Sequence, residues 1–353
     1  MNSRPWGIIL AGGDGTRLKT VSQVVSGDNR PKQFCVLLGS TSLLARTRGR
    51  LSSSIEPNQM LFAVVRDHER FYRPELADVD ESRIVIQPAN RGTTAAIIYS
   101  LLRLTRLEKD PVVAFFPADH HFVDEAQFAR TVNSSFEVVT KHPRMLVLLG
   151  ARADKPEVGY DWIEPGYAMD NGGRCSLPVF RVNRFWEKPS TSTAEELLGR
   201  GCLWNTFVIA GYARTFLEIL ESSIPQTLKS FQAVAGSRLK EEEATRATTL
   251  YERLPGGDFS HEILTHVVDR LAVLRMDNAG WSDLGTPQGL LEALKKTASA
   301  ADSLENTQAV GSYQNPTAPS VFTAWTEAYR HRLEELCERA SSNAAMPGWQ
   351  RGT

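Results

Sequence analysis

Residues 6–18 read WGIILAGGDGTRL and open the regular part of the chain. The apolar run Trp6–Leu10 is typical of a buried strand, and the glycine-rich loop Gly12–Gly15 follows it directly. Because glycine has no side chain, backbone N–H groups in such a loop can approach a phosphate or a base closely. Two familiar nucleotide-binding loops do not fit this sequence. No Lys-Ser/Thr pair completes a P-loop, and Leu18 stands where the dinucleotide-binding pattern of dehydrogenases needs its third glycine.

Strand-like runs and helical patterns alternate from this loop to about residue 297. Val112–Phe116 is apolar at every position, as expected of a strand buried on both faces, whereas Ala95–Leu107 has apolar residues at helical spacing. This alternation predicts an α/β fold with a Rossmann-like, mostly parallel sheet flanked by helices. Three later runs predict a small, partly antiparallel layer over that sheet: Trp162–Pro165, Phe180–Trp186 and Leu203–Ala210.

The sequence changes character beyond residue 297. Ser299–Pro319 is rich in small and polar residues and is typical of a linker. Val321–Arg339 has the apolar stripe of an amphipathic helix, formed by Phe322, Trp325, Tyr329, Leu333 and Leu336. That stripe would pack on the body or on a second subunit, so a homodimer is one expected assembly. We therefore predict a catalytic domain over residues 1–297 and a C-terminal part, 298–353, that consists of a linker and a helix.

The composition excludes several classes of protein. The 353 residues carry 40 Lys+Arg and 41 Asp+Glu, for a net charge of −1, which argues against a general nucleic-acid binder. No apolar run is long enough for a membrane helix, and the N-terminus lacks the apolar core of a signal peptide. The four cysteines lie far apart without a CxxC pair, so they indicate neither a disulfide framework nor a zinc site. We expect a cytoplasmic protein without a nucleic-acid or membrane partner.

Charged residues near the loop point to phosphate chemistry. Arg17 follows Gly15, and Lys32 lies within RPKQF (residues 30–34). The loop's backbone donors, the planar fork of Arg17 and the point charge of Lys32 can together surround a triphosphate. Asp119 follows a buried strand, at the end where open α/β sheets bind ligands, and its carboxylate suits Mg²⁺.

The adjacent histidines His120 and His121 receive no catalytic role. Neighbouring residues of an extended chain point to opposite sides, which argues against a two-histidine metal site.

GGDGTRL (residues 12–18) followed by RPKQF resembles the signature of the sugar-1-phosphate nucleotidyltransferases. Within that family the similarity is greatest to the branch that uses GTP and mannose 1-phosphate. Lys19–Ser22 replaces the usual Pro-Leu after the loop, and Trp186 replaces a usual Val. Five more segments match in the expected order: QPANRGTT (87–94), EVGY (157–160), WEKP (186–189), WNTF (204–207) and GWSDLG (280–285).

The resemblance implies a nucleotide-diphospho-sugar transferase fold of GT-A-like type and transfer of GMP from GTP to a sugar 1-phosphate, with release of pyrophosphate. It implies Arg17, Lys32, Asp119 and Asp283 as catalytic residues, with Asp119 and Asp283 holding Mg²⁺. The nucleotide-binding residues that it implies are Leu10, Ala11, Gly12, Gly13, Gly15, Thr16, Gln87, Asn90, Arg91, Gly92 and Thr93. Those implied for the sugar phosphate are Gly159, Tyr160, Glu187, Lys188 and Asn205. From the local residues, Asn90 is also a plausible N-cap for the helix that follows it.

Several alternatives stay open at this level. Mannose 1-phosphate is the expected acceptor, but members of the guanylyl branch also accept manno-configured heptose phosphates. Other relatives use UTP, dTTP or CTP, and PKQF favours GTP by resemblance. A different class is a catalytically weak relative that senses a nucleotide sugar. Such a protein would have lost Arg, Lys or Asp at the phosphate centre, whereas Arg17, Lys32 and Asp119 are all present here.

Overall fold

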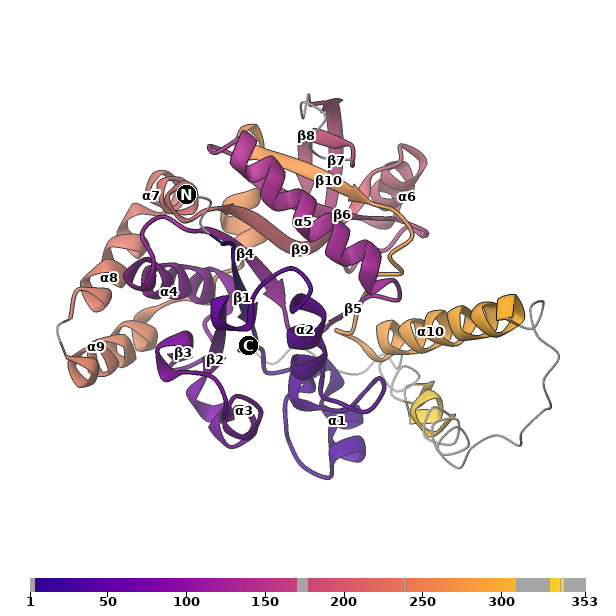
Figure 1. Cartoon of the computed structure of the whole chain (residues 1–353), viewed down its shortest axis with the longest axis horizontal. Helices are drawn as coiled ribbons and strands as arrows, with labels where there is room; N and C mark the ends of the chain where they lie inside the picture. The colour runs from indigo at the N-terminus through magenta and orange to yellow at the C-terminus, as the bar shows by residue number, and fades with distance from the viewer. Residues whose placement is uncertain (1–3, 170–176, 238, 309–330, 337, 340–353) are drawn as a thin grey trace. The chain divides into compact units, whose positions relative to one another are not determined.

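A computed structural model describes residues 4–169, 177–237, 239–308, 331–336, 338 and 339 (Figure 1). The chain separates into two compact units that interleave along the sequence. Unit 1 comprises Met1–Gly13, Thr47–Ala118 and Asp124–Ala279, and unit 2 comprises Asp14–Arg46, Asp119–Val123 and Gly280–Thr353. The sequence-based division at residue 297 stays a prediction.

Unit 1 is built on one mixed sheet, which has nine strands within the described residues, in the order β3-β2-β1-β4-β9-β6-β10-β8-β7. From the pairings, β8 and β9 run opposite to the other strands, so the predicted mostly parallel sheet is confirmed. The strands are β1 (Trp6–Leu10), β2 (Met60–Val65), β3 (Ile84–Gln87), β4 (Val112–Pro117), β6 (Leu146–Arg152), β7 (Trp162–Ala168), β8 (Val179–Trp186), β9 (Leu203–Tyr212) and β10 (Leu271–Met276).

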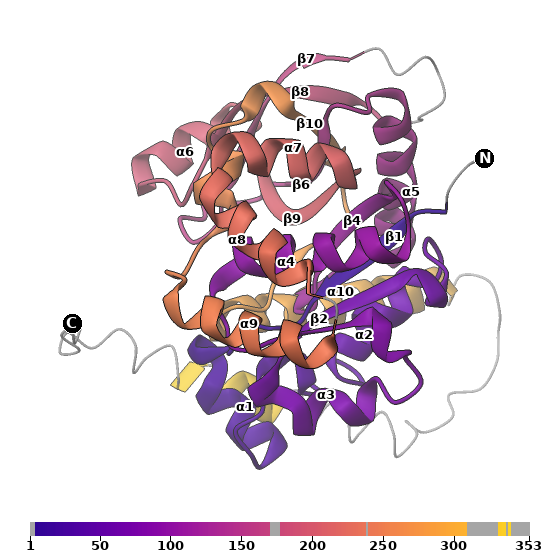
Figure 2. The same ribbon diagram turned by 90° about the vertical axis from the view of Figure 1, so that its left-hand side faces the viewer.

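Helices cover both faces of this sheet. Adjacent residues of β4 point to opposite faces. Phe115 packs edge-on against Phe216 of α7 at 5.2 Å between ring centroids, and Phe116 meets Phe128 of α5 at 6.3 Å. One cluster of buried side chains joins the sheet to α4, α7, α8 and α9. These helices lie together on the face to which Phe115 points (Figure 2). This confirms the prediction that Val112–Phe116 is a strand buried on both faces.

The helices of unit 1 agree with the expected alternation, and three of them, α3, α6 and α8, were not predicted. Their bounds are α3 (Glu69–Glu75), α4 (Gly92–Leu107), α5 (Glu125–Lys141), α6 (Thr191–Gly199), α7 (Ala213–Ser223), α8 (Pro225–Ala235) and α9 (Lys240–Arg253). Helix α2 (Leu43–Leu51) begins in unit 2 and ends in unit 1.

The predicted antiparallel strands are present, but they extend the main sheet instead of lying over it. β9 is inserted between β4 and β6 and runs antiparallel to both. β7 and β8 form an antiparallel pair at the end of the sheet, where β8 pairs with β10. Leu203–Tyr212 can occupy an interior position because its residues are mostly buried.

Unit 2 is smaller and has its own apolar core. It contains α1 (Lys19–Ser26), α10 (Pro287–Gln308), and a two-stranded sheet of β5 (His120–His121) and β11 (Ser282–Asp283). The core joins the first helices to α10 and to the helical residues 331–336. Its buried side chains include Leu18, Val21, Leu284, Leu290, Leu294 and Leu333.

The C-terminal region differs in part from its prediction. α10 continues to Gln308, well into the stretch interpreted as a linker. Residues 331–336 are helical and Leu333 is buried, which confirms that part of the predicted amphipathic helix. Phe322, Trp325 and Tyr329, also assigned to its apolar stripe, lie outside the described residues. Across the described part of the chain, no helix has the length and apolar character needed to cross a bilayer.

Candidate active site

In unit 1, the first part of the glycine loop lies against Gln87. A side-chain carbon placed at Gly12 would be 3.1 Å from Gln87 Nε2 and 3.2 Å from Val65 Cγ1, whereas Gly13 has open space around it. The loop's entry is fixed because Ala11 donates its backbone N–H to Ala63 O at 2.8 Å. The structure therefore brings the loop and Gln87 together, as a shared nucleotide site requires.

In unit 2, the second part of the loop is shaped around Lys32. Gly15 has φ +63°, a left-handed conformation that glycine adopts readily. Any side-chain carbon there would lie 3.1 Å from the backbone N of Lys32. Thr16–Leu18 then forms a 3-10 turn that carries Arg17.

Lys32 lies at the centre of the charged cluster in unit 2. The residue is 8% exposed, and its Nζ donates to Leu284 O at 3.1 Å. The same Nζ lies 2.6 Å from Asp119 Oδ2 and 3.9 Å from Asp283 Oδ1. Two carboxylates far apart in the sequence thus converge on one cation.

The small β5–β11 sheet explains this convergence. His120 pairs with Asp283 across the two strands, and Leu284 donates its N–H to Asp119 O. Because Asp119 directly precedes β5 and Asp283 ends β11, backbone pairing fixes both carboxylates next to each other. The ladder also carries the carbonyl of Leu284 that accepts from Lys32.

Arg17 borders the same cluster. A side-chain carbon placed at Gly285 would lie 2.8 Å from Arg17 Nη2 and 2.9 Å from Asp283 Oδ2, so both groups flank this glycine. The structure thus gathers Arg17, Lys32, Asp119 and Asp283 in one unit. Their roles in catalysis stay predictions.

The cluster keeps Asp119 ionised. Burial alone would raise the pKa of Asp119, but the Lys32 ammonium and His120 outweigh it and lower that pKa to about 2. His120 lies with Nε2 3.9 Å from Asp283 Oδ1 and accepts the indole N–H of Trp281 at Nδ1, at 3.3 Å. His121 instead contacts Thr297 Oγ1. The two histidines have different partners, as predicted, and His120 is closer to the charged groups than the sequence suggested.

This donor set fits a hard divalent cation. Asp119 and Asp283 already share one positive charge, that of Lys32, and carboxylate oxygens are the ligands that such ions prefer. Among the described residues, no three or more His, Cys, Asp or Glu side chains form a metal cage. Two carboxylates suit an ion whose remaining ligands come from substrate phosphates and water.

The segment QPANRGTT begins α4 and packs against residues 257–262. The helix starts at Gly92 with Arg91 at the N-cap position, so Asn90 is not the N-cap. Asn90 lies one residue before the N-cap, and its Oδ1 accepts the N–H of Gly92 at 3.0 Å. Gly92 has φ +83°, and a side-chain carbon there would lie 2.0 Å from Gly257 O, so only glycine allows the two backbones to meet.

Side chains fix this segment from both ends. Thr93 Oγ1 accepts the N–H of Phe259 at 2.8 Å. Arg91 Nε donates to Tyr251 O at 2.7 Å, and the Tyr251 hydroxyl donates to Gln87 Oε1 at 3.2 Å. Tyr251 therefore holds two residues that the resemblance assigns to the nucleotide.

The sugar-side residues of unit 1 lie around Trp204. Tyr160 packs edge-on against Trp204 with 5.3 Å between ring centroids. Asn205 is buried, and its Oδ1 accepts the N–H of Phe207 at 3.1 Å. The structure thus brings together Tyr160 and Asn205, which are separated by a long stretch of sequence.

Glu187 and Lys188 form the charged part of this region. Glu187 Oε1 lies 3.9 Å from Lys188 Nζ, and Glu187 Oε2 accepts a hydrogen bond from His261 Nδ1. Lys188 has a positive φ of 36°, which is uncommon for a residue with a side chain and often marks a functional position.

Residues 257–262 were missed by the sequence interpretation. They contact the predicted base segment through Gly257 and Phe259 and the predicted sugar segment through His261. Ser260–Leu264 forms a π-helical turn, a rare feature that is frequent at functional sites. The Gly256–Asp258 run indicates a turn in the sequence, but no periodic pattern marks what the turn contacts.

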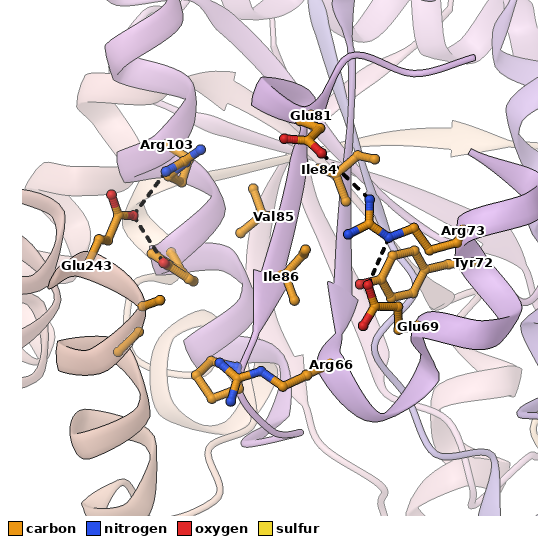
Figure 3. A pocket seen from close by; sticks show the side chains of 14 residues that line it. Arg66, Glu69, Tyr72, Arg73, Glu81, Ile84, Val85, Ile86, Arg103 and Glu243 are labelled. Carbon is orange, nitrogen blue, oxygen red and sulfur yellow. Dashed lines mark hydrogen bonds and ion pairs between the residues drawn. The ribbon is translucent and has the colours of Figure 1, made fainter. Parts of the chain in front are cut away.

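A cavity of about 320 Å³ lies along the edge strand β3, between α3 on one side and α4 with α9 on the other (Figure 3). It contains none of the predicted site residues. Its charged walls are paired internally, since Glu243 accepts from Tyr99 and Arg103 while Arg73 pairs with Glu69. Arg106 also donates to Glu243, at 2.7 Å.

Glu243 lies on α9, the helix that also carries Tyr251. It therefore links the wall of this cavity to the predicted nucleotide-binding residues that Tyr251 holds. We expect Glu243→Gln to lower the free energy of unfolding by about 2 kcal/mol at pH 7, since two arginines lose their buried partner. Burial raises the pKa of Glu243, but Arg106 and Arg103 outweigh it and lower the pKa overall. Its stabilisation is therefore present above the unfolded-state pKa and is lost as the pH falls through the folded-state value.

Urea unfolding of the wild type and Glu243→Gln between pH 7 and pH 3 measures this effect. The two proteins should differ at neutral pH and converge in acid. Glu242→Gln, at a half-buried neighbouring residue that pairs with Arg246 on the same helix, is the matched control and should stay within about 0.5 kcal/mol of the wild type. A pH-independent difference would contradict the assignment.

Comparisons with known proteins point to one protein family. Residues 6–300 match the family model described as nucleotidyl transferase. Xanthan biosynthesis protein XanB from Xanthomonas campestris is 28% identical over 353 residues, covering 95% of this chain and 72% of its own. A mannose-1-phosphate guanylyltransferase from Escherichia coli is 28% identical over 302 residues, which cover 84% of this chain and 61% of the relative.

A solved structure shows the same fold. A protein from Thermus thermophilus, described as a mannose-1-phosphate geranyltransferase, superimposes with a TM-score of 0.70 and 25% identity, over 82% of this chain and 79% of its own. The family match covers the glycine loop, both carboxylates and the predicted base and sugar segments. The chain belongs to the nucleotidyl transferase family.

Proposed function

We propose that this protein transfers GMP from GTP to mannose 1-phosphate, which gives GDP-mannose and pyrophosphate. The observation that carries the proposal is the convergence of Asp119 and Asp283 on Lys32, beside Arg17. This arrangement suits a reaction between highly charged phosphates. Relatives named mannose-1-phosphate guanylyltransferase support the choice of GTP and mannose 1-phosphate.

The reaction needs positioning and charge balance more than proton transfer. An oxygen of the sugar phosphate attacks the α-phosphorus of GTP in line, and the bond from that phosphorus to the β-phosphate oxygen breaks. The attacking phosphate is already ionised at neutral pH, so no general base is required. Arg17 and Lys32 supply positive charge from well-fixed positions, which is where an enzyme of this type gains its rate.

A divalent cation, in this proposal Mg²⁺, would be held by Asp119 and Asp283. When bound, it would neutralise phosphate charge and align the groups. Asp119 can take part because Lys32 and His120 keep its carboxyl ionised.

Unit 1 would recognise the two ends of the product. Gln87, fixed by Tyr251, and the segment that begins α4 would hold the nucleoside. Glu187 would accept sugar hydroxyls, and Lys188 would bind the sugar phosphate. Lys188 suits that role because its side chain is 55% exposed and is only loosely paired with Glu187.

We expect Lys188→Ala to raise the KM for mannose 1-phosphate about tenfold or more and to change the KM for GTP much less, because a charged contact to one substrate is lost. Steady-state kinetics with each substrate varied in turn measure the two constants. Lys229→Ala, on the exposed side of α8, is the matched control. A larger effect on GTP would exchange the two predicted subsites.

Pyrophosphate release tests the proposal as a whole. We expect release with GTP, mannose 1-phosphate and Mg²⁺, with ATP, UTP, dTTP and CTP much slower and EDTA abolishing it. Release with a manno-heptose 1-phosphate instead would keep the mechanism and change the acceptor. Tight binding of GDP-mannose without release from any pair would favour a nucleotide-sugar sensor.

A further inference from the structure

Asp161 is a second carboxylate beside the predicted sugar residues, and neither the resemblance nor the mechanism above uses it. It follows Tyr160 in the chain, and its backbone carbonyl accepts the N–H of Asn205 at 2.8 Å. The backbone of Asp161 is therefore tied to Tyr160 and Asn205, two residues that the resemblance places at the sugar.

One oxygen of the Asp161 carboxylate is open for a further hydrogen bond. Its Oδ1 is buried and has no hydrogen-bond partner among the described residues. Ser260 is 1% exposed and lies within reach of a side-chain hydrogen bond to Asp161, although its hydroxyl has no partner of normal hydrogen-bond geometry among the described residues. A buried polar atom without a hydrogen-bond partner is destabilising, so an open carboxylate oxygen beside a serine hydroxyl indicates a site that a ligand completes.

The charges around Asp161 define what that ligand presents. Burial is the largest influence and raises the pKa of Asp161; Asp258 and Glu187 raise it further, while Ser260 and Lys188 oppose them. Asp258, Glu187 and Asp161 itself would repel a phosphate, so the anion belongs near Lys188. A neutral hydroxyl, which donates one hydrogen bond and accepts another, suits a carboxylate and a serine together.

We propose that Asp161 and Ser260 form a hydroxyl-recognition pair in the sugar pocket, with Asp161 Oδ1 accepting a hydrogen bond from one ring hydroxyl of the sugar 1-phosphate and of the nucleotide sugar. The inference rests on the proposed function. It adds a specificity-determining group, since a site built for a hydroxyl discriminates strongly against a sugar that lacks it. Glu187 and Asp161 would then read different hydroxyls of one ring.

The test combines variants of the protein with variants of the sugar. Wild type, Asp161→Asn and Asp161→Ala are assayed with mannose 1-phosphate and with its 2-, 3-, 4- and 6-deoxy analogues. We expect kcat/KM for mannose 1-phosphate to fall about tenfold in Asp161→Asn and about a hundredfold in Asp161→Ala, because a hydrogen bond to a charged acceptor is lost. For one deoxy analogue the variants and the wild type should be equal within about twofold, since that sugar never made the bond.

Two further measurements separate this inference from the proposed function. Calorimetric titration with GDP-mannose and the corresponding deoxy nucleotide sugars reports recognition without turnover, and it should show the same single-analogue pattern. Asp67→Asn makes the same chemical change at an exposed position and should behave as the wild type. Circular dichroism melting checks that each variant is folded.

The outcomes are distinct. Equal losses in the Asp161 variants across all five sugars, in kinetics and in binding, would show a structural role and overturn the inference while the proposed function stands. A wild type that turns over no sugar phosphate, yet shows the single-analogue pattern in calorimetry, would overturn the proposed function and support the recognition pair.

Discussion

Replacing Lys32 by Met should lower kcat for pyrophosphate release by about 10²–10³-fold, because a positioned charge at the reacting phosphates is removed. Methionine keeps most of the length of the stem but has no charge. Two carboxylates would then face each other without the cation on which they converge. Since Lys32 is the strongest influence that lowers the pKa of Asp119, that pKa should also rise in the variant.

Kinetics at saturating GTP and mannose 1-phosphate measure this loss. Lys19→Met is the matched control, because Lys19 is exposed on α1 in the same unit and should leave kcat unchanged. Thermal unfolding of both variants separates lost chemistry from lost structure. A folded Lys32→Met protein whose kcat stays within about threefold of the wild type would remove Lys32 from the catalytic residues.

Asp283→Asn should lower kcat by a similar factor of about 10²–10³ and raise the Mg²⁺ concentration for half-maximal rate about tenfold or more. Asparagine has nearly the same shape and keeps one oxygen, so the β5–β11 pairing should persist. What is lost is the charge of one of the two proposed metal ligands.

Titration with Mg²⁺ at saturating substrates distinguishes this role from a general defect. Asp277→Asn makes the same change at a half-buried residue of unit 1, which is paired with Arg275, and should leave the metal dependence as in the wild type. An Asp283→Asn enzyme with reduced kcat but an unaltered Mg²⁺ profile would assign Asp283 to positioning Lys32 rather than to the metal.

Much of the fold follows from local pattern. Val112–Phe116 reads as a strand buried on both faces, and Phe115 and Phe116 do meet helices on opposite faces. The position of β9 could not be predicted, because an apolar run does not specify which strands it will pair with or in which direction. Likewise, α10 continues beyond residue 297 through polar and small residues that are compatible with both helix and linker.

The charged centre was predicted better than its surroundings. Arg17 and Lys32 are close in sequence, and Asp119 stands at a strand end, so local reasoning finds them. That Asp283 joins them depends on the two-residue strands β5 and β11, which are too short to give a periodic signal. Tyr251 and His261 were missed because their contacts with the predicted base and sugar residues are long-range, and no motif spacing shows them.

Isotope labelling of the sugar phosphate shows which oxygen attacks the α-phosphorus of GTP. The protein is incubated with GTP, Mg²⁺ and mannose 1-phosphate that carries ¹⁸O in its non-bridging phosphate oxygens. Mass spectrometry then measures the masses of both products. We expect GDP-mannose that retains the label and an equal amount of unlabelled pyrophosphate, because the sugar phosphate oxygen attacks the α-phosphorus of GTP. Label in pyrophosphate, or GTP consumed without any GDP-sugar, would contradict it.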